Sequence, residues 1–461
     1  IKTRVSAYMK DLDEELWKLG ILAKTKHNEV APAQHELAPV FTSTNVASDQ
    51  NQLMMETMKR VAIRHGLYCL LHEKPFAGIN GSGKHNNWSM STDTGLNLLD
   101  PGSTPAENGQ FMLFLTAVIK AVDEYQDLLR LSVANAGNDH RLGANEAPPA
   151  IVSMFVGEEL EAVIDSLEKG VKYNGKGKKT MKLGVDTLPE LPKDTTDRNR
   201  TSPFAFTGNK FEFRMVGSSF SLAGPNITIN TIVADELRQF ADELEGAPDF
   251  NAALHDLVVR EIKAHKRIIF NGNNYSEEWT AEAERRGLSN LKNAAEALPH
   301  FTDKKSIELF ERNKVFTERE VVTRTEIMLE NYSKMLTIEA LTMIEMAKKD
   351  IYPAVDGYVN ELCGALKGKK EALPSARFAA EERIISLLAA DSEAMLERAE
   401  KLDELLIESK GCAAAAETAA FFADKVIPVM CELRAYADEM ELNTAKKYWP
   451  FPTYGDILFS V

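Results

Sequence analysis

The chain has little of what marks several large classes of protein. Its 461 residues contain four cysteines, Cys69, Cys363, Cys412 and Cys431, and none belongs to a CxxC pair. Scattered thiols of this kind argue against a disulfide framework or a zinc ribbon, and favour a reducing cytoplasm. No apolar run approaches the roughly 18 residues that a membrane-spanning helix requires.

An excess of positive charge is also missing. The formal net charge is −15, which argues against a general binder of nucleic acid or of acidic membranes. Because net charge describes the whole surface, it does not exclude a local basic pocket for an anionic substrate. A hydrophobic content of 44% and a charged content of 27% are those of an ordinary globular protein, and the length predicts two or three packed units.

The sequence divides into two regions that differ in their hydrophobic periodicity. Residues 1–235 mix short strand-like segments with helical runs and contain the chemical motifs, whereas residues 236–461 show helical periodicity and no chemical motif. We therefore expect a mixed α and β domain over 1–235 and a helical domain over 236–461 that stabilises or assembles the protein. Gly, Lys, Pro and Asp dominate residues 167–200, which predicts a long exposed loop.

Several helix boundaries follow from local signals. An apolar stripe opens the chain almost at once and ends at Gly20, so we expect that an N-terminal portion on which it packs is missing. In the second half we expect a helix to begin at Thr317-x-x-Glu320 and to stop at Pro353, another to end at Lys410-Gly411, and a kink or break at Pro428.

A glycine-rich segment resembles a phosphate-binding P-loop without fitting it. Gly78-x-x-x-x-Gly83-Lys84 has the right spacing, but His85 stands where a Ser or Thr would bind magnesium. A P-loop also needs a strand before it, for which residues 68–72 are the candidate, and a helix after it. The following residues instead alternate with a period of two, which predicts a strand. His85 is then either a ligand-binding residue beside glycines that admit close approach, or a hydrogen-bonded histidine next to a tight turn.

Two further segments contain acidic residues in suggestive positions. Glu29 and Glu36 flank Ala31-Pro32-Ala33, and a turn there would bring both carboxylates together. Lys210, Glu212 and Arg214 share one face of a predicted strand. That face is either a solvent-exposed charged face or a site that combines a metal-bound carboxylate with cations for phosphate or carboxylate recognition.

These groups together suggest a reaction. Three carboxylates and one imidazole are hard, oxygen-rich ligands that suit Mg²⁺ or Mn²⁺ and not a structural zinc. A divalent ion, cationic side chains and a glycine loop are the parts that phosphoryl transfer requires.

Four motifs in order carry a resemblance to a known family. They are "NEVAPAQHE", "NGSGKHNN", "HRLGANEAPPA" and "NKFEFR", and in this order they resemble the glutamine synthetases, most of all the large bacterial type III form. The resemblance covers essentially the whole chain, as the C-terminal two-thirds of such an enzyme. It implies an α+β fold, with an antiparallel sheet and flanking helices over 1–235, followed by the extended all-helical region over 236–461.

The resemblance assigns roles to individual residues. The implied metal ligands are Glu29, Glu36, His85 and Glu212. The implied substrate-binding residues are Asn80, Gly81, Arg141 and Arg214, of which the two arginines also act in catalysis together with Glu146. The implied nucleotide-binding residues are His27, Asn87, Ser89, Arg200 and Lys210.

The activity implied by the resemblance is ATP-dependent ligation of ammonia to L-glutamate through γ-glutamyl phosphate. It implies ATP and Mg²⁺ or Mn²⁺ as cofactors, a cytoplasmic location and a homo-oligomer, a dodecamer of two stacked hexamers. Alternatives are a γ-glutamyl-polyamine synthetase, another carboxylate–amine ligase, or a structural relative that has lost its chemistry. Glu146 has a plainer interpretation as a loop cap, and Arg200 as a solvated charge.

The sequence departs from the family pattern at some positions. The E-x-E strand that supplies further metal carboxylates is absent, and Asp11 and Asp13 in the opening helix do not replace it. The N-terminal domain is absent too. Lys210 stands where Arg is more usual, and Asn87 where many relatives have His.

Overall fold

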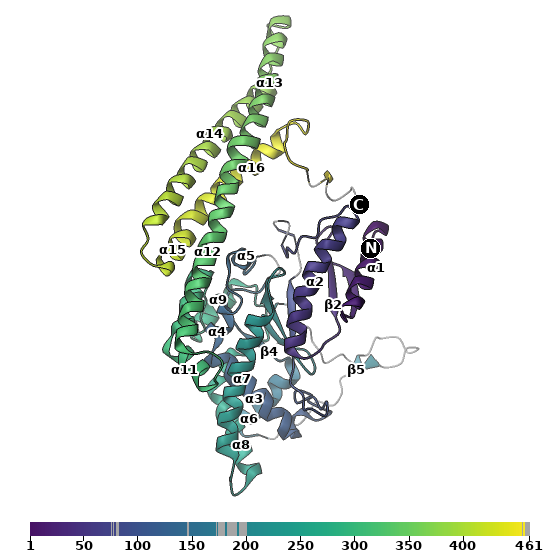
Figure 1. Cartoon of the computed structure of the whole chain (residues 1–461), viewed down its shortest axis with the longest axis vertical. Coiled ribbons are helices and arrows are strands. Elements are labelled where there is room, and N and C mark those ends of the chain that lie inside the picture. Colours follow the sequence, from purple (N-terminus) through teal and green to yellow (C-terminus); the bar gives the residue numbers. More distant parts are fainter. Residues whose placement is uncertain are drawn as a thin grey trace. The chain divides into compact units, whose positions relative to one another are not determined.

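The computed structural model describes residues 1–74, 76, 78–79, 83–144, 147–171, 173, 180–181, 191–192, 201–453 and 455–456. The chain forms two compact units (Figure 1). Unit 1 comprises residues 1–293 and 300–322, and unit 2 comprises residues 294–299 and 323–461. The change of texture expected at residue 235 therefore does not coincide with the division into compact units, and the functional assignment of 1–235 and 236–461 stays a prediction.

A four-stranded sheet forms the centre of unit 1. Its order is β3 (Lys84–Trp88), β8 (Phe211–Val216), β7 (Phe204–Phe206) and β4 (Met154–Phe155). The pairings are antiparallel except for that of β4 with β7, which is parallel. Phenylalanines hold these strands together: Phe204 and Phe211 are fully buried and stack with ring centroids 4.8 Å apart.

A separate hairpin and two helices form the start of unit 1. Strands β1 (Ala23–Asn28) and β2 (His35–Pro39) pair antiparallel, and α1 (Thr3–Lys18) packs on α2 (Thr44–Arg64). The predicted apolar stripe is the reason, since Leu12 and Leu16 lie in one buried cluster with Val61. The helix ends just before Gly20, whose φ of +73° is a backbone conformation that glycine adopts without strain.

The remaining elements of unit 1 are mostly helical. The apolar run of residues 108–134 forms α3 (Gly109–Glu124) and α4 (Gln126–Leu131), and α3 packs against α7 (Ala223–Leu244) and α8 (Phe250–His265). The shorter elements are η1 (Pro105–Glu107), α5 (Ala136–Asp139), α6 (Glu158–Lys169), β5 (Thr180–Met181), β6 (Leu191–Pro192), η2 (Lys266–Ile268), α9 (Glu277–Arg285), η3 (Leu298–Thr302) and α11 (Lys304–Arg312). Most of the loop expected over 167–200 lies outside the described residues.

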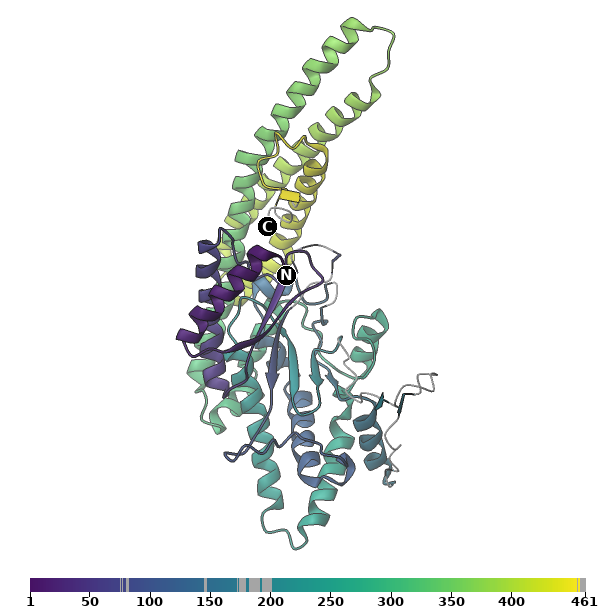
Figure 2. The same ribbon diagram turned by 90° about the vertical axis from the view of Figure 1, so that its right-hand side faces the viewer.

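Unit 2 is helical, as its sequence predicts. Its long helices are α12 (Glu318–Met346, of which residues 323–346 belong to unit 2), α13 (Tyr352–Ala372), α14 (Ala379–Glu408) and α16 (Ile427–Asn443). Helix α13 continues the line of α12, and α14 packs against α13 and α16 (Figure 1, Figure 2). The shorter elements are α10 (Ala294–Ala297), η5 (Ser409–Gly411) and α15 (Ala415–Phe421). The predicted capping box is present, because the backbone N–H of Thr317 donates to the Glu320 carboxylate at 2.8 Å.

Neither Pro353 nor Pro428 ends a helix, so the predicted stop at Pro353 and the predicted break at Pro428 are wrong, while a kink at Pro428 stays a prediction. Pro353 does not stop a helix: a π-helical turn, η4 (Ala347–Ile351), follows α12 and leads directly into α13. Pro428 likewise follows a π-helical turn, η6 (Phe422–Val426), and lies in the first turn of α16. A proline in a first turn lacks only an N–H that would have had no partner within that helix, and the π turn absorbs the change in hydrogen bonding.

None of the helices in the described ranges is both long and apolar enough to cross a bilayer.

Candidate metal and anion site

The hairpin β1–β2 gathers the first group of acidic residues. His27 lies opposite Glu36 in the strand register, and the backbone N–H of Glu29 donates to the Gln34 carbonyl at 3.0 Å. The turn is completed by Ala33, whose φ is +55°. The turn expected around Ala31-Pro32-Ala33 is therefore present, and it brings the two glutamates together.

His27 completes this group. Its Nε2 lies 2.9 Å from Oε1 of Glu29 and 3.8 Å from Oε2 of Glu36, and one potential ligand atom from each residue lies within 4.8 Å of the others. Sequence reasoning assigned His27 to the nucleotide, so its place beside the carboxylates is new. Its alternation with Glu29 along the strand direction was the available signal. We call His27, Glu29 and Glu36 the hairpin cluster.

The glycine loop leads into a strand and not into a helix. Strand β3 pairs with β8, with Asn87 opposite Glu212, and the register shifts between Lys84 and Asn86, where the single residue His85 lies opposite two residues of β8, Arg214 and Met215. His85, Asn87 and Ser89 are exposed and alternate with the buried Asn86 and Trp88. The strand interpretation is thus confirmed and the P-loop is excluded. The strand expected over 68–72 is wrong, because that segment is irregular.

His85 is the point at which the two halves of the site interact electrostatically. Withdrawal of much of its ring from bulk water, together with the nearby charge of Arg214, lowers the pKa of His85 to about 4, while Glu212 and Glu29 oppose the shift. The direction of this shift favours the neutral imidazole, which is the form that binds metal ions.

A buried ion pair lies on β8. Glu212 is 6% exposed and Arg214 is 5% exposed, and Arg214 donates to Oε2 of Glu212 from Nη2 at 2.7 Å and from Nε at 3.1 Å. The predicted sharing of one strand face explains the pairing. The solvent-exposed interpretation of this face is wrong, because both sides of β8 are buried. A buried pair of this kind is stable only when its charges are well compensated.

Arg141 approaches the same strand from the segment after α5. Its side chain is buried, and Nη2 donates to the backbone carbonyl of Arg214 at 2.6 Å. Glu73, which sequence reasoning did not single out, lies 3.9 Å from Nε of Arg141. The available signal was an acidic residue between the apolar segment 67–71 and the glycine loop.

The remaining predicted residues either have other partners or lie outside the described residues. Ser89 donates from Oγ to the carbonyl of Asn209 at 2.8 Å, and Lys210 is half-buried in the β7–β8 turn. Asp11 and Asp13 are occupied by His65 and Lys26 respectively, in keeping with their exclusion as metal ligands. Asn80, Gly81, Glu146 and Arg200 lie outside the described residues.

Unit 1 is an α+β fold that carries a carboxylate–imidazole cluster on its hairpin and two buried arginines, Arg141 and Arg214; these are the kinds of group that bind a divalent ion and an anionic substrate. Comparison with known proteins gives the family. The family model described as "Glutamine synthetase, catalytic domain" matches residues 2–145, and that described as "Glutamine synthetase C-terminal domain" matches residues 253–370. The chain belongs to the glutamine synthetase family.

Individual relatives extend over the whole chain. A glutamine synthetase of Butyrivibrio fibrisolvens is 50% identical and a type-3 glutamine synthetase of Dictyostelium discoideum is 43% identical, each over 100% of this chain. The chain spans 66% and 63% of these relatives. Among solved structures, a GmaS/ADP complex has a TM-score of 0.41 and 14% identity over 71% of this chain and 60% of its own, which is too distant to guide the site.

Proposed function

We propose that the protein containing this chain ligates ammonia to the γ-carboxylate of L-glutamate, with hydrolysis of ATP to ADP and phosphate. The observation that carries the proposal is that unit 1 holds two groups of the required kind: the hairpin cluster, whose potential ligand atoms lie within 4.8 Å of one another, and the buried Glu212–Arg214 pair, joined at 2.7 Å. The identity to glutamine synthetases over the full chain supports the same reaction.

The donor set fits a divalent cation. Within the hairpin cluster, one carboxylate oxygen of Glu29 and one of Glu36 lie within 4.8 Å of each other, and His85 has its pKa lowered to about 4 and so offers a neutral ring. We assign Glu29, Glu36, His85 and Glu212 as the ligands, with Mg²⁺ or Mn²⁺ as the ion because the set is rich in hard oxygen donors. A bound divalent ion would neutralise negative charge on a transferring phosphoryl group.

The protein's own residues would act mainly through position and charge. In the first step a γ-carboxylate oxygen of glutamate bonds to the γ-phosphorus of ATP, the bond to the β,γ-bridging oxygen breaks, and ADP leaves. Arg214 and Arg141 would stabilise the charge on glutamate and on the transferring group. Asn80 and Gly81 would hold the amino acid, and the nucleotide would contact His27, Asn87, Ser89, Arg200 and Lys210.

The second step forms the amide. Ammonia nitrogen attacks the γ-carbonyl carbon, the carbon–oxygen bond to phosphate breaks, and inorganic phosphate leaves. We assign Glu146 as the base that accepts the proton of ammonium, for which it must be ionised. As further proposals, the protein is cytoplasmic and assembles as a homododecamer of two stacked hexamers.

The test is formation of glutamine and ADP by the full-length protein with ATP, Mg²⁺ or Mn²⁺, glutamate and ammonium. His85→Ala and Glu146→Ala should abolish ammonium-dependent turnover, whereas Glu107→Gln, which changes an exposed carboxylate in η1, should leave it unchanged. Turnover with amines but not with ammonium would instead identify a γ-glutamyl-amine ligase. No turnover with either acceptor would point to a structural relative.

A further inference from the structure

Glu73 is a buried carboxylate that the proposed reaction does not use. It is 4% exposed, and its Oε1 accepts a hydrogen bond from the backbone N–H of Ser218, just beyond β8, at 3.1 Å. The same oxygen lies 3.9 Å from Nε of Arg141. A carboxylate is removed from water at considerable cost unless its charge is compensated, so cations on the protein side must offset the burial.

Two cations lie near Glu73. Burial lowers the pKa of the Arg141 guanidinium, and Glu73 is the largest influence opposing that shift. Burial lowers the pKa of the Lys84 ammonium to about 8, and Glu73 opposes that shift as well. Within the described part of the chain, Glu73 is the one carboxylate in ion-pair range of Arg141.

The two terminal nitrogens of the Arg141 guanidinium are held by a backbone carbonyl and by a side-chain amide. Nη2 donates to the Arg214 carbonyl at 2.6 Å, and Nη1 donates weakly to Oδ1 of Asn138 at 3.4 Å. Gly83 provides the space, since a Cβ on that residue would lie 2.2 Å from Nη2. The Nε of Arg141 has no hydrogen bond among the described residues. The charge of Glu73, 3.9 Å away, is therefore what restrains this side of the guanidinium.

The segment around Glu73 is also tied to the hairpin cluster. The Gln34 side chain, in the turn between Glu29 and Glu36, donates from Nε2 to the backbone carbonyls of His72 at 3.1 Å and Glu73 at 3.2 Å. Glu73 therefore contacts, through its own atoms, the β1–β2 turn, the end of β8 and Arg141.

We propose that Glu73 is a positioning residue that holds the Arg141 guanidinium in the orientation needed to bind the anionic substrate. This inference rests on the proposed function, because it takes glutamate as the substrate that Arg141 binds. Its physical basis is that displacement of a charged group by about 1 Å can cost about 100-fold in an active site.

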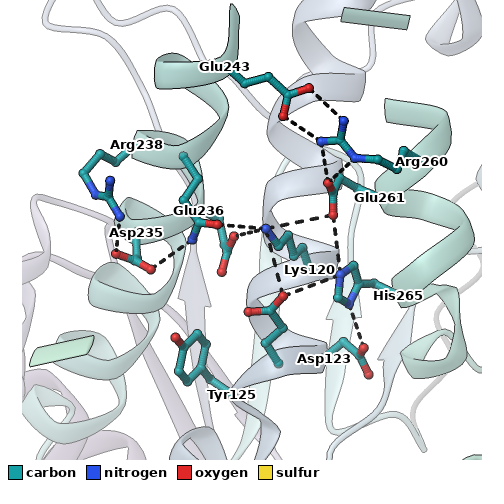
Figure 3. Close-up of polar contacts among 12 residues, drawn as sticks. Lys120, Asp123, Tyr125, Asp235, Glu236, Arg238, Glu243, Arg260, Glu261 and His265 are labelled. Atoms are coloured by element: carbon teal, nitrogen blue, oxygen red, sulfur yellow. Dashed lines mark hydrogen bonds and ion pairs between the residues drawn. The ribbon is translucent and has the colours of Figure 1, made fainter. Parts of the chain in front are cut away.

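The experiment compares Glu73→Gln with Glu236→Gln in the full-length protein. Glu236 is a matched control, because it is also a buried glutamate of unit 1, on α7, and it belongs to the separate polar network of Figure 3. We expect Glu73→Gln to raise the KM and the Kd for glutamate by about 10- to 100-fold. The KM for ATP should change little, and Glu236→Gln should leave the KM and the Kd for glutamate as in the wild type.

Two further variants separate positioning from folding. Glu73→Asp keeps the charge but shortens its reach, so its glutamate affinity should lie between those of the wild type and Glu73→Gln, and it serves if Glu73→Gln does not fold. Combining Glu73→Gln with Arg141→Lys should give less than the sum of the separate losses, because both changes act on one interaction.

The outcomes separate this inference from the proposed function. Equal glutamate affinity for Glu73→Gln and Glu236→Gln overturns the positioning role, whatever the wild type does with ammonium. Absence of ammonium-dependent turnover in the wild type overturns the proposed function alone. In that case crystal structures of the wild type and of Glu73→Gln decide the role of Glu73: a displaced guanidinium supports it, and an unmoved one overturns it.

Discussion

Two buried ion pairs of unit 1 have the same separation but different surroundings. Arg214 Nη2 lies 2.7 Å from the Glu212 carboxylate, and Lys120 Nζ lies 2.7 Å from that of Glu236. Arg214 adds a second donor to the same oxygen. Lys120 approaches Glu236 without hydrogen-bond alignment, since neither Glu236 oxygen has a hydrogen-bond partner in the described part of the chain.

The neighbours differ as well (Figure 3). Lys120, on α3, has Glu261 of α8 at 3.9 Å and Glu124 of α3 at 4.0 Å in addition to Glu236. Burial and the charges of Glu124 and Asp235 raise the pKa of Glu236 to about 7, although Lys120 opposes the shift. Separation alone therefore does not determine the state of a buried pair: in the first pair two donors of Arg214 hold the carboxylate of Glu212, whereas in the second pair the pKa of the Glu236 carboxyl is raised to about 7.

The largest expected effect is at the first pair. Arg214→Ala removes a cation that the proposed reaction needs, and takes the two guanidinium hydrogen bonds away from the buried carboxylate of Glu212. We expect glutamine formation to fall by about 100- to 1,000-fold and unfolding to become easier by about 3 kcal/mol. Initial rates and urea unfolding measure the two effects. Arg214→Lys keeps the charge but loses the paired donors of the guanidinium, so it should regain part of the stability. Wild-type rates in Arg214→Ala would contradict the role of Arg214.

Lys120→Met breaks the second pair and should act on stability without abolishing activity. The buried Glu236 loses its main cation, which costs about 3 kcal/mol when the carboxylate is ionised. At pH 5.5 Glu236 is protonated in the folded variant, so the loss should be much smaller than at pH 8. Urea unfolding at the two pH values measures this difference, and equal losses at both would show that Glu236 does not set the cost.

Glu236→Gln tests the sign of the pH dependence directly. The folded pKa of about 7 lies above the ordinary value of 4.5, so the folded state binds this proton more tightly. The associated stability is complete below pH 4.5 and is lost as the pH rises through 7. The amide resembles the protonated acid, so the variant should gain about 2–3 kcal/mol over the wild type between pH 5 and pH 8. Unfolding curves that run parallel across this range would refute the shift.

The smallest effect is expected at the rim of the same network. Arg260 is bound by Glu243 through two short contacts, of 2.8 and 2.7 Å, and by the buried Glu261 at 2.7 and 2.9 Å, but its own side chain is half-exposed. Exposed pairs are screened by solvent, so Arg260→Met should cost about 0.5 kcal/mol. Thermal unfolding at low and high salt measures this loss of stability. A loss as large as that of Lys120→Met would show that the exposed and the buried pairs of this network contribute equally.

Part of the site could be predicted because its signals are local. The proline-containing turn between Glu29 and Glu36 and the period of two after Gly83 each depend on a few neighbouring residues, and both appear in the structure. Glu73 could not be found in this way. Its partners Arg141 and Ser218 lie far along the chain, and no spacing rule connects them.

The fold likewise has features that could be predicted from neighbouring residues and features that could not. The capping box at Thr317 was predictable, because its two partners are three residues apart. The π turns before Pro353 and Pro428 were not, because tertiary packing decides whether a proline ends a helix or follows a local change of winding.

By itself the sequence determined the α+β and helical textures, the two strands that carry His85 and Glu212, and the family. Periodicity, turn chemistry and motif order are properties of neighbours in the chain. Only the tertiary structure decided that His27 joins Glu29 and Glu36, that Glu212 and Arg214 are buried, and that Glu73 meets Arg141. Charge and burial act through space, so these results depend on which distant segments pack together.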